Sequence, residues 1–87
     1  MQTEDIADRL RQFIRSEFGV PADDSEFNDD VDLYNYGYVD SFGGVTLNGF
    51  VEREFQIELS ETDLINVPLN TIRGISAFVA KRRRGEM

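Results

Sequence analysis

Apolar residues recur every three or four positions in three stretches of the chain, and this repeat constrains the fold more than any other feature. The first stretch repeats at Ile6, Leu10, Phe13, Ile14 and Phe18; the second at Leu47, Val51 and Phe55, with Phe50 beside them; the third at Ile72, Ile75, Phe78 and Val79. This spacing gathers the apolar side chains on one face of a helix. No stretch alternates apolar and polar residues as a half-buried strand would. The pattern predicts an all-α fold.

Capping and breaking residues indicate where the helices begin and end. Gly19 and Pro21 follow the first repeat and predict the end of the first helix. The second helix is expected from Ser41 to about Gln56. Asn70 or Thr71 is expected to cap the last helix.

A short additional helix is expected before the last one. Ser60-Glu61-Thr62-Asp63 is a plausible cap that opens a helical turn over Leu64, Ile65 and Val67, and Pro68 ends it. We therefore predict a small bundle of three long helices and one short helix, forming a single domain of residues 1–87. The basic residues within 81–87, Lys81-Arg82-Arg83-Arg84, are expected to form a frayed, solvated tail.

Residues 20–40 form a long acidic connection between the first two helices. They show neither helical nor strand periodicity, and aromatic residues are scattered through them. Long loops in compact domains are uncommon and are often functional. The aromatic residues predict that this loop packs over the core. Three glycines in the next helix, Gly43, Gly44 and Gly49, each cost about 1 kcal/mol relative to alanine. Either some group approaches the helix surface closely, or the helix is simply a weak one.

Charge and composition exclude several classes of function. The net charge is −8, and residues 1–80 alone hold 5 basic and 16 acidic side chains, a net −11. Such a surface repels nucleic acid and anionic lipid; it serves simple solubility or, alternatively, favours basic protein partners. No apolar run approaches the roughly 20 residues that cross a bilayer. Neither a signal peptide nor a transit peptide is expected at the acidic N-terminus, so the cytoplasm is the expected compartment.

The chain has no histidine and no cysteine, which argues against an enzyme. Without them there is no thiolate nucleophile, no disulfide and no histidine to activate a serine. Ser41 is followed by Gly43, but Val39 stands where a hydrolase nucleophile elbow needs glycine. An EF-hand frame that starts at Asp24 places Asp29 and Asn35 where glycine and glutamate are required, so no EF-hand is expected, and weak divalent binding by the acidic loop stays open.

Asp40-Ser41-Phe42-Gly43-Gly44-Val45 opens the second helix, and its local chemistry leaves two interpretations. Ser41, or Asp40 before it, is an ordinary N-cap. Alternatively, the Ser41 hydroxyl lies exposed at a helix N-terminus, where unpaired N–H groups suit a phosphate ester.

Asp40-Ser41-Phe42 resembles the Asp-Ser-Leu motif of acyl carrier proteins, the phosphopantetheine-binding family. The resemblance continues through Val45 and Leu47, Phe55-Gln56-Ile57-Glu58-Leu59, Asp63-Leu64 and Thr71-Ile72, and so covers nearly the whole chain. It implies that a phosphopantetheinyl transferase attaches 4′-phosphopantetheine from coenzyme A to Ser41. The arm would carry an acyl or aminoacyl group as a thioester, loaded by a ligase and delivered to downstream acyl-transferring enzymes.

The resemblance also implies which residues face the partner enzymes. Asp40 and Phe42 flank the modified serine, and the partner-facing side of the second helix matches Val45, Thr46, Gly49, Glu52 and Arg53. Fatty-acid carriers usually place acidic residues along that face, and this chain does not. Its many phenylalanines also leave less room for a long acyl chain. We therefore expect a monomeric carrier of specialised metabolism; the alternative is a non-catalytic acidic module that binds a basic partner.

Overall fold

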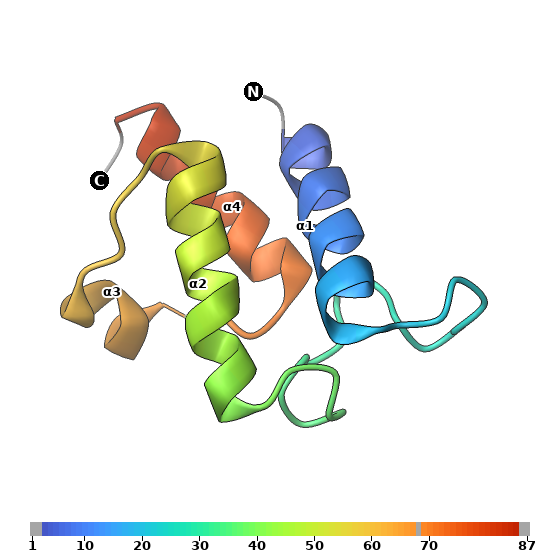
Figure 1. The fold of residues 1–87 in the computed structure, drawn as a ribbon. Coiled ribbons are helices and arrows are strands. Elements are labelled where there is room, and N and C mark those ends of the chain that lie inside the picture. Colours follow the sequence, from blue (N-terminus) through green and yellow to red (C-terminus); the bar gives the residue numbers. More distant parts are fainter. Residues whose placement is uncertain (1–2, 68, 86–87) are drawn as a thin grey trace.

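Four helices make up the regular structure in the computed structural model, which describes residues 3–67 and 69–85. They are α1 (Thr3–Phe18), α2 (Ser41–Phe55), α3 (Glu61–Asn66) and α4 (Ile72–Arg83) (Figure 1). The described residues contain no strand. The all-α prediction of three long helices and one short one is confirmed.

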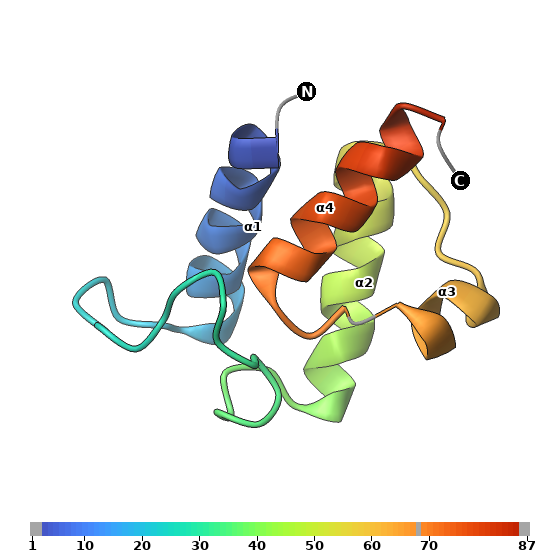
Figure 2. The same ribbon diagram turned by 180° about the vertical axis from the view of Figure 1, so that it is seen from behind.

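The apolar repeats form one shared core. α1 packs chiefly along α4 and also meets α2, and Figure 2 shows α4 crossing in front of α2. The residues of the three repeats are buried or partly buried, with Phe55 and Leu47 of α2 fully enclosed. Phe13 and Phe50, at the α1–α2 contact, stack with ring centroids 3.9 Å apart.

The helix ends confirm several predicted caps. The Ser60 hydroxyl accepts from the Asp63 N–H, while the Asp63 carboxylate accepts from the Ser60 N–H, so this pair forms a complete capping box for α3. Thr71, rather than Asn70, caps α4 and accepts from the Gly74 N–H at 2.9 Å. Gln56 ends α2 in the left-handed region, with φ 56°. Pro68, the expected stop after α3, lies outside the described residues.

The loop of residues 19–40 is fastened to the bundle at several points. Its buried residues are Val20, Phe27, Val31, Leu33 and Val39. The Leu33 N–H donates to the Asn70 carbonyl and the Arg73 N–H to the Asp29 carbonyl, both at 2.9 Å. The prediction that the loop packs over the core is confirmed, although Tyr36 points away and is exposed.

The basic C-terminal run departs from the prediction of a frayed tail. α4 continues to Arg83, and two of the arginines bind other segments. Arg82 donates to the Glu58 carbonyl at 2.9 Å, and Arg83 donates to the Phe55 carbonyl at 2.7 Å. The prediction is wrong for these two residues because carbonyl groups at the end of α2 and in the next loop lie within their reach.

Candidate functional site: the N-terminal end of helix α2

Asp40 caps helix α2. Its backbone is extended, with φ −91° and ψ 177°, and its Oδ1 accepts from the Gly43 N–H at 2.6 Å. Its carbonyl accepts the first helical bond, from the Gly44 N–H at 2.9 Å. These are the two tasks of an N-cap residue. The sequence left open whether Asp40 or Ser41 does this, and the structure assigns the cap to Asp40.

Ser41 is the first residue of α2, and its side chain is exposed. Because Asp40 supplies the cap, the Ser41 hydroxyl is not needed to hold the helix end. Within the described part of the chain it makes no hydrogen bond. The first N–H groups of a helix lack partners within the helix and attract anions. The position therefore fits a phosphate ester, with the Asp40 carboxylate as the unfavourable neighbour.

Two large apolar side chains project into solvent beside Ser41. Phe42 is 83 % exposed and Val45 is 73 % exposed, in line with the partner-facing positions that the resemblance implies. Contiguous exposed apolar side chains, unlike single scattered ones, mark protein–protein contact sites on many proteins. The core does not use them.

The glycines after Phe42 permit close packing, but with this chain's own rings rather than with an outside molecule. A Cβ added at Gly43 would lie 2.8 Å from Cε1 of Phe18, and one at Gly44 would lie 2.7 Å from the Tyr34 hydroxyl. Phe18 comes from the end of α1 and Tyr34 from the acidic loop. These contacts fix the N-terminal end of α2 against both segments.

The remaining residues predicted to face partners are spread along α2. Thr46 and Gly49 are partly exposed, and Arg53 is exposed. The Glu52 carboxylate accepts from the Leu59 N–H at 2.8 Å, so it already holds the connection between α2 and α3. Sequence reasoning did not identify this structural contact.

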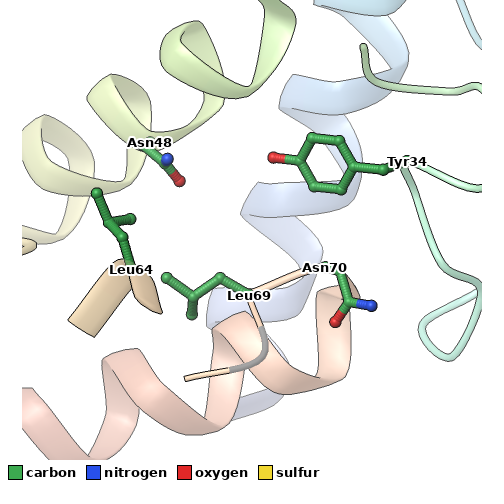
Figure 3. Close-up of a pocket in the computed structure, with 5 residues that line it drawn as sticks. All are labelled: Tyr34, Asn48, Leu64, Leu69 and Asn70. Carbon is green, nitrogen blue, oxygen red and sulfur yellow. The ribbon is translucent and has the colours of Figure 1, made fainter. Parts of the chain in front are cut away.

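A pocket of about 410 Å³ lies beside α2 and joins three parts of the chain (Figure 3). It is lined by Tyr34, Asn48, Leu64, Leu69 and Asn70. In Figure 3 the Tyr34 hydroxyl and the Asn48 amide point toward the space between them. Burial and the nearby Asp32 carboxylate raise the pKa of Tyr34, so it stays a neutral donor. Sequence reasoning missed this site, because no local pattern links a loop, α2 and the segment around α3.

Several carboxylates of the acidic loop bind other groups of this chain. Among the described residues no group of three or more metal-ligating side chains comes together. Instead, Asp29 accepts from Arg11 at 2.6 Å and Asp30 from Arg73 at 2.5 Å. Asp32 accepts from the Tyr34, Asn35 and Asn70 N–H groups, and its pKa is lowered chiefly by the backbone N–H of Asn35. These carboxylates hold the loop together.

A small helical bundle in which an exposed serine, with apolar side chains beside it, lies at the capped N-terminal end of a helix fits a carrier domain. Residues 8–79 match the family model described as the phosphopantetheine attachment site. The match covers most of the chain, so the chain belongs to this phosphopantetheine-binding carrier family. Members carry 4′-phosphopantetheine and do not themselves catalyse a reaction. A comparison with curated proteins gave no significant match.

No helix in the described residues is both long and apolar enough to span a membrane.

Proposed function

We propose that Ser41 carries the 4′-phosphopantetheine arm, and that this chain delivers an acyl or aminoacyl thioester to partner enzymes. The assignment to Ser41 is supported most directly by the different roles of Asp40 and Ser41 at the N-terminal end of α2. Asp40 binds the Gly43 N–H and caps the helix, while Ser41 is exposed with a hydroxyl that binds nothing in the described chain. A transferase can therefore modify Ser41 without uncapping α2.

The Ser41 hydroxyl is the only group that this chain needs to contribute to the attachment reaction. The Ser41 oxygen attacks the phosphorus that bears pantetheine in coenzyme A, and a phosphodiester forms as the pyrophosphate bond breaks. Adenosine bisphosphate leaves, and the hydroxyl proton passes to the phosphopantetheinyl transferase. The helix N-terminus favours the new phosphodiester anion by electrostatics.

The partners we propose are that transferase, a dedicated acyl- or aminoacyl-loading ligase and downstream acyl-transferring enzymes of specialised metabolism. Residues 41–51 of α2 carry no charged side chain, in a chain whose net charge is −8. A partner that reads this stretch must therefore use apolar and polar contacts rather than a row of basic residues. The pocket beside α2 also supports a role in specialised metabolism, since Tyr34, Asn48 and Asn70 offer hydrogen bonds that a plain fatty chain does not use.

The partner-facing surface we propose comprises Asp40, Phe42, Val45, Thr46, Gly49, Glu52 and Arg53. Phe42 and Val45 are its apolar anchors, because both side chains are apolar and largely exposed. Truncating a residue that anchors an interface costs more than about 1 kcal/mol of binding. We expect Phe42→Ala or Val45→Ala to lower kcat/KM for loading about tenfold while the urea midpoint stays unchanged. Phe42→Leu should restore most of the loading. A loss of cooperative unfolding in the alanine variants would show that these residues belong to the core.

A direct experiment tests the attachment site. The apo-protein is incubated with coenzyme A and a broad-specificity phosphopantetheinyl transferase, and the product is mapped by peptide mass spectrometry. We expect the mass of one phosphopantetheinyl group on Ser41, its loss in Ser41→Ala, and its retention in Ser16→Ala, which alters an exposed serine of α1. Modification that survives Ser41→Ala would refute the assignment.

The alternative function is an acidic helical module that binds a basic partner without any attached group. Its support is the net charge of −8. It predicts no modification in the same assay, together with partner binding that weakens strongly as salt is raised. We propose the cytoplasm as the compartment and a monomer as the working form, as a diffusing carrier requires.

A further inference from the structure

Helix α3 is attached to the bundle in an unusual way. None of its residues is buried, and Ile65 is 80 % exposed. A helix that buries no apolar side chain gains little from packing, and most helices in proteins depend on that gain. Something other than core burial must therefore hold α3 in place.

Arg82, near the end of α4, provides the attachment. Its Nη2 donates to both carboxylate oxygens of Asp63 in α3 at 3.1 Å, and its Nη1 donates to the Glu58 carbonyl in the preceding loop. Its guanidinium carbon lies 4.7 Å from the centre of the Phe78 ring, which fixes the arginine against its own helix. The neighbouring Arg83 binds the Phe55 carbonyl at the end of α2.

The attachment is incomplete, which favours reversible opening. The Arg82 Nε is buried without a hydrogen-bond partner in the described chain, and a buried unpaired donor destabilises the closed arrangement. The capping box of Ser60 and Asp63 lies entirely within α3 and its cap, so it does not fasten α3 to the bundle. Released α3 has only six residues and is too short to keep its helical hydrogen bonds without contacts to the bundle, so its backbone N–H groups exchange when it opens.

Helix α3 also forms one wall of the pocket beside α2. Leu64 faces that pocket opposite Asn48, and Leu69 follows α3 in the chain (Figure 3). Displacing α3 removes this wall and widens the space.

We propose that Arg82 is a latch that holds α3 as a flap over the pocket beside α2, so that breaking the Arg82–Asp63 pair opens the pocket. This gives a task to the basic run of the C-terminus, which the carrier function leaves unexplained. The latch does not require the arm on Ser41. Its test uses the unmodified full chain, so failure of the latch and failure of the carrier assignment are separate results.

Amide hydrogen exchange tests the latch. Arg82→Met keeps an apolar stem and removes the ion pair; Arg73→Met is the matched control, because Arg73 lies on the same helix and binds Asp30 in the acidic loop. In Arg82→Met we expect the Leu64 and Val67 amides, which bond to Ser60 and Asp63, to exchange about tenfold faster than in the original chain. In Arg73→Met the α3 amides should change by less than about twofold. Asp63→Asn, which retains an acceptor for the Ser60 N–H, should reproduce the Arg82→Met result.

A thiol reporter tests the opening of the pocket. The chain has no cysteine, so Asn48→Cys places a single thiol at the pocket and Val45→Cys a single thiol on the exposed face. Adding Arg82→Met should accelerate labelling of the first and leave the second unchanged. The proposal is overturned if α3 exchange does not change, if every helix exchanges faster together, or if α3 exchange rises without faster labelling at position 48.

Discussion

Adding one methyl group at either of two glycines in α2 should have opposite effects on stability. In a helix, Gly→Ala is favourable by about 1 kcal/mol when the new methyl group meets no obstacle. At Gly44 the new Cβ would lie 2.7 Å from the Tyr34 hydroxyl oxygen and 3.1 Å from Cε1 of the same ring. At Gly49 the nearest atom is Nη1 of Arg53 at 3.2 Å, the end of a flexible side chain that can swing away.

The Tyr34 ring cannot yield as easily. It must retreat by about 0.7 Å to reach ordinary contact at 3.4 Å, and it packs against the core while lining the pocket. Overpacking of this kind costs about 1–3 kcal/mol, which exceeds or cancels the helix gain. We therefore expect Gly44→Ala to lower the free energy of unfolding by up to about 2 kcal/mol, and Gly49→Ala to raise it by about 0.5–1 kcal/mol.

Urea unfolding followed by far-UV circular dichroism measures both variants. In thermal melts each kcal/mol corresponds to about 4–8 °C in Tm for a chain of this size. Adding Tyr34→Phe to Gly44→Ala removes the closest atom and should recover part of the loss. If Gly44→Ala is as stabilising as Gly49→Ala, the close approach of Tyr34 does not constrain the helix.

Four further predictions follow from single contacts. Asp40→Ala removes the cap that binds the Gly43 N–H and should lower the free energy of unfolding by about 1 kcal/mol in urea titrations, whereas Asp40→Asn should retain most of it. Ser76 is 1 % exposed and its hydroxyl has no partner in the described chain, so Ser76→Ala should raise stability by about 1 kcal/mol; a decrease would mean that the hydroxyl is bonded in solution. Burial and the Asp24 carboxylate raise the pKa of Tyr38 to about 12, so the stability it contributes is complete below pH 10.0, its ordinary value, and is lost as pH rises through 12. Tyrosinate absorbance should show this late titration, and Tyr38→Phe should remove it. The pKa of Asp30 is lowered from 3.8 chiefly by Arg73, and that of Asp63 chiefly by the Ser60 N–H. The stability that these carboxylates contribute is therefore complete above pH 3.8 and declines as acid protonates them below it. Chemical denaturation at stepped pH should show the loss of stability only below pH 3.8, and an equal loss between about pH 7 and 5 would contradict this prediction.

The sequence predicted the helices well because their signals are local. Periodic apolar residues such as Leu47, Val51 and Phe55 fix which face of a helix is buried, and that prediction needs no knowledge of the partner segment. The cap at Ser60 was equally readable, since a capping box is complete within four residues.

Contacts between distant segments could not be predicted from the sequence. The glycine pair at 43 and 44 signalled a close approach but not its source, because nothing local says that Phe18 and Tyr34 provide it. The run at 81–84 appeared to be a solvated tail, since the carbonyls that Arg82 and Arg83 bind lie more than twenty residues earlier. The same limit hid the pocket.

The structure also changes the meaning of the acidic loop. As a sequence, its carboxylates favour attraction of a basic partner. In the fold, Asp29 and Asp30 bind Arg11 and Arg73, and these pairs tie the loop to α1 and α4. The loop in turn supplies Tyr34, whose ring packs against Gly44 and positions the end of α2 that bears Ser41. Much of this acidity therefore stabilises the arrangement around Ser41, and the start of α2 is uncharged, which supports our proposal that partners recognise Phe42 and Val45. A partner for such a surface needs an apolar recess at the point where the serine enters, and its affinity should depend on salt far less than the net charge alone implies.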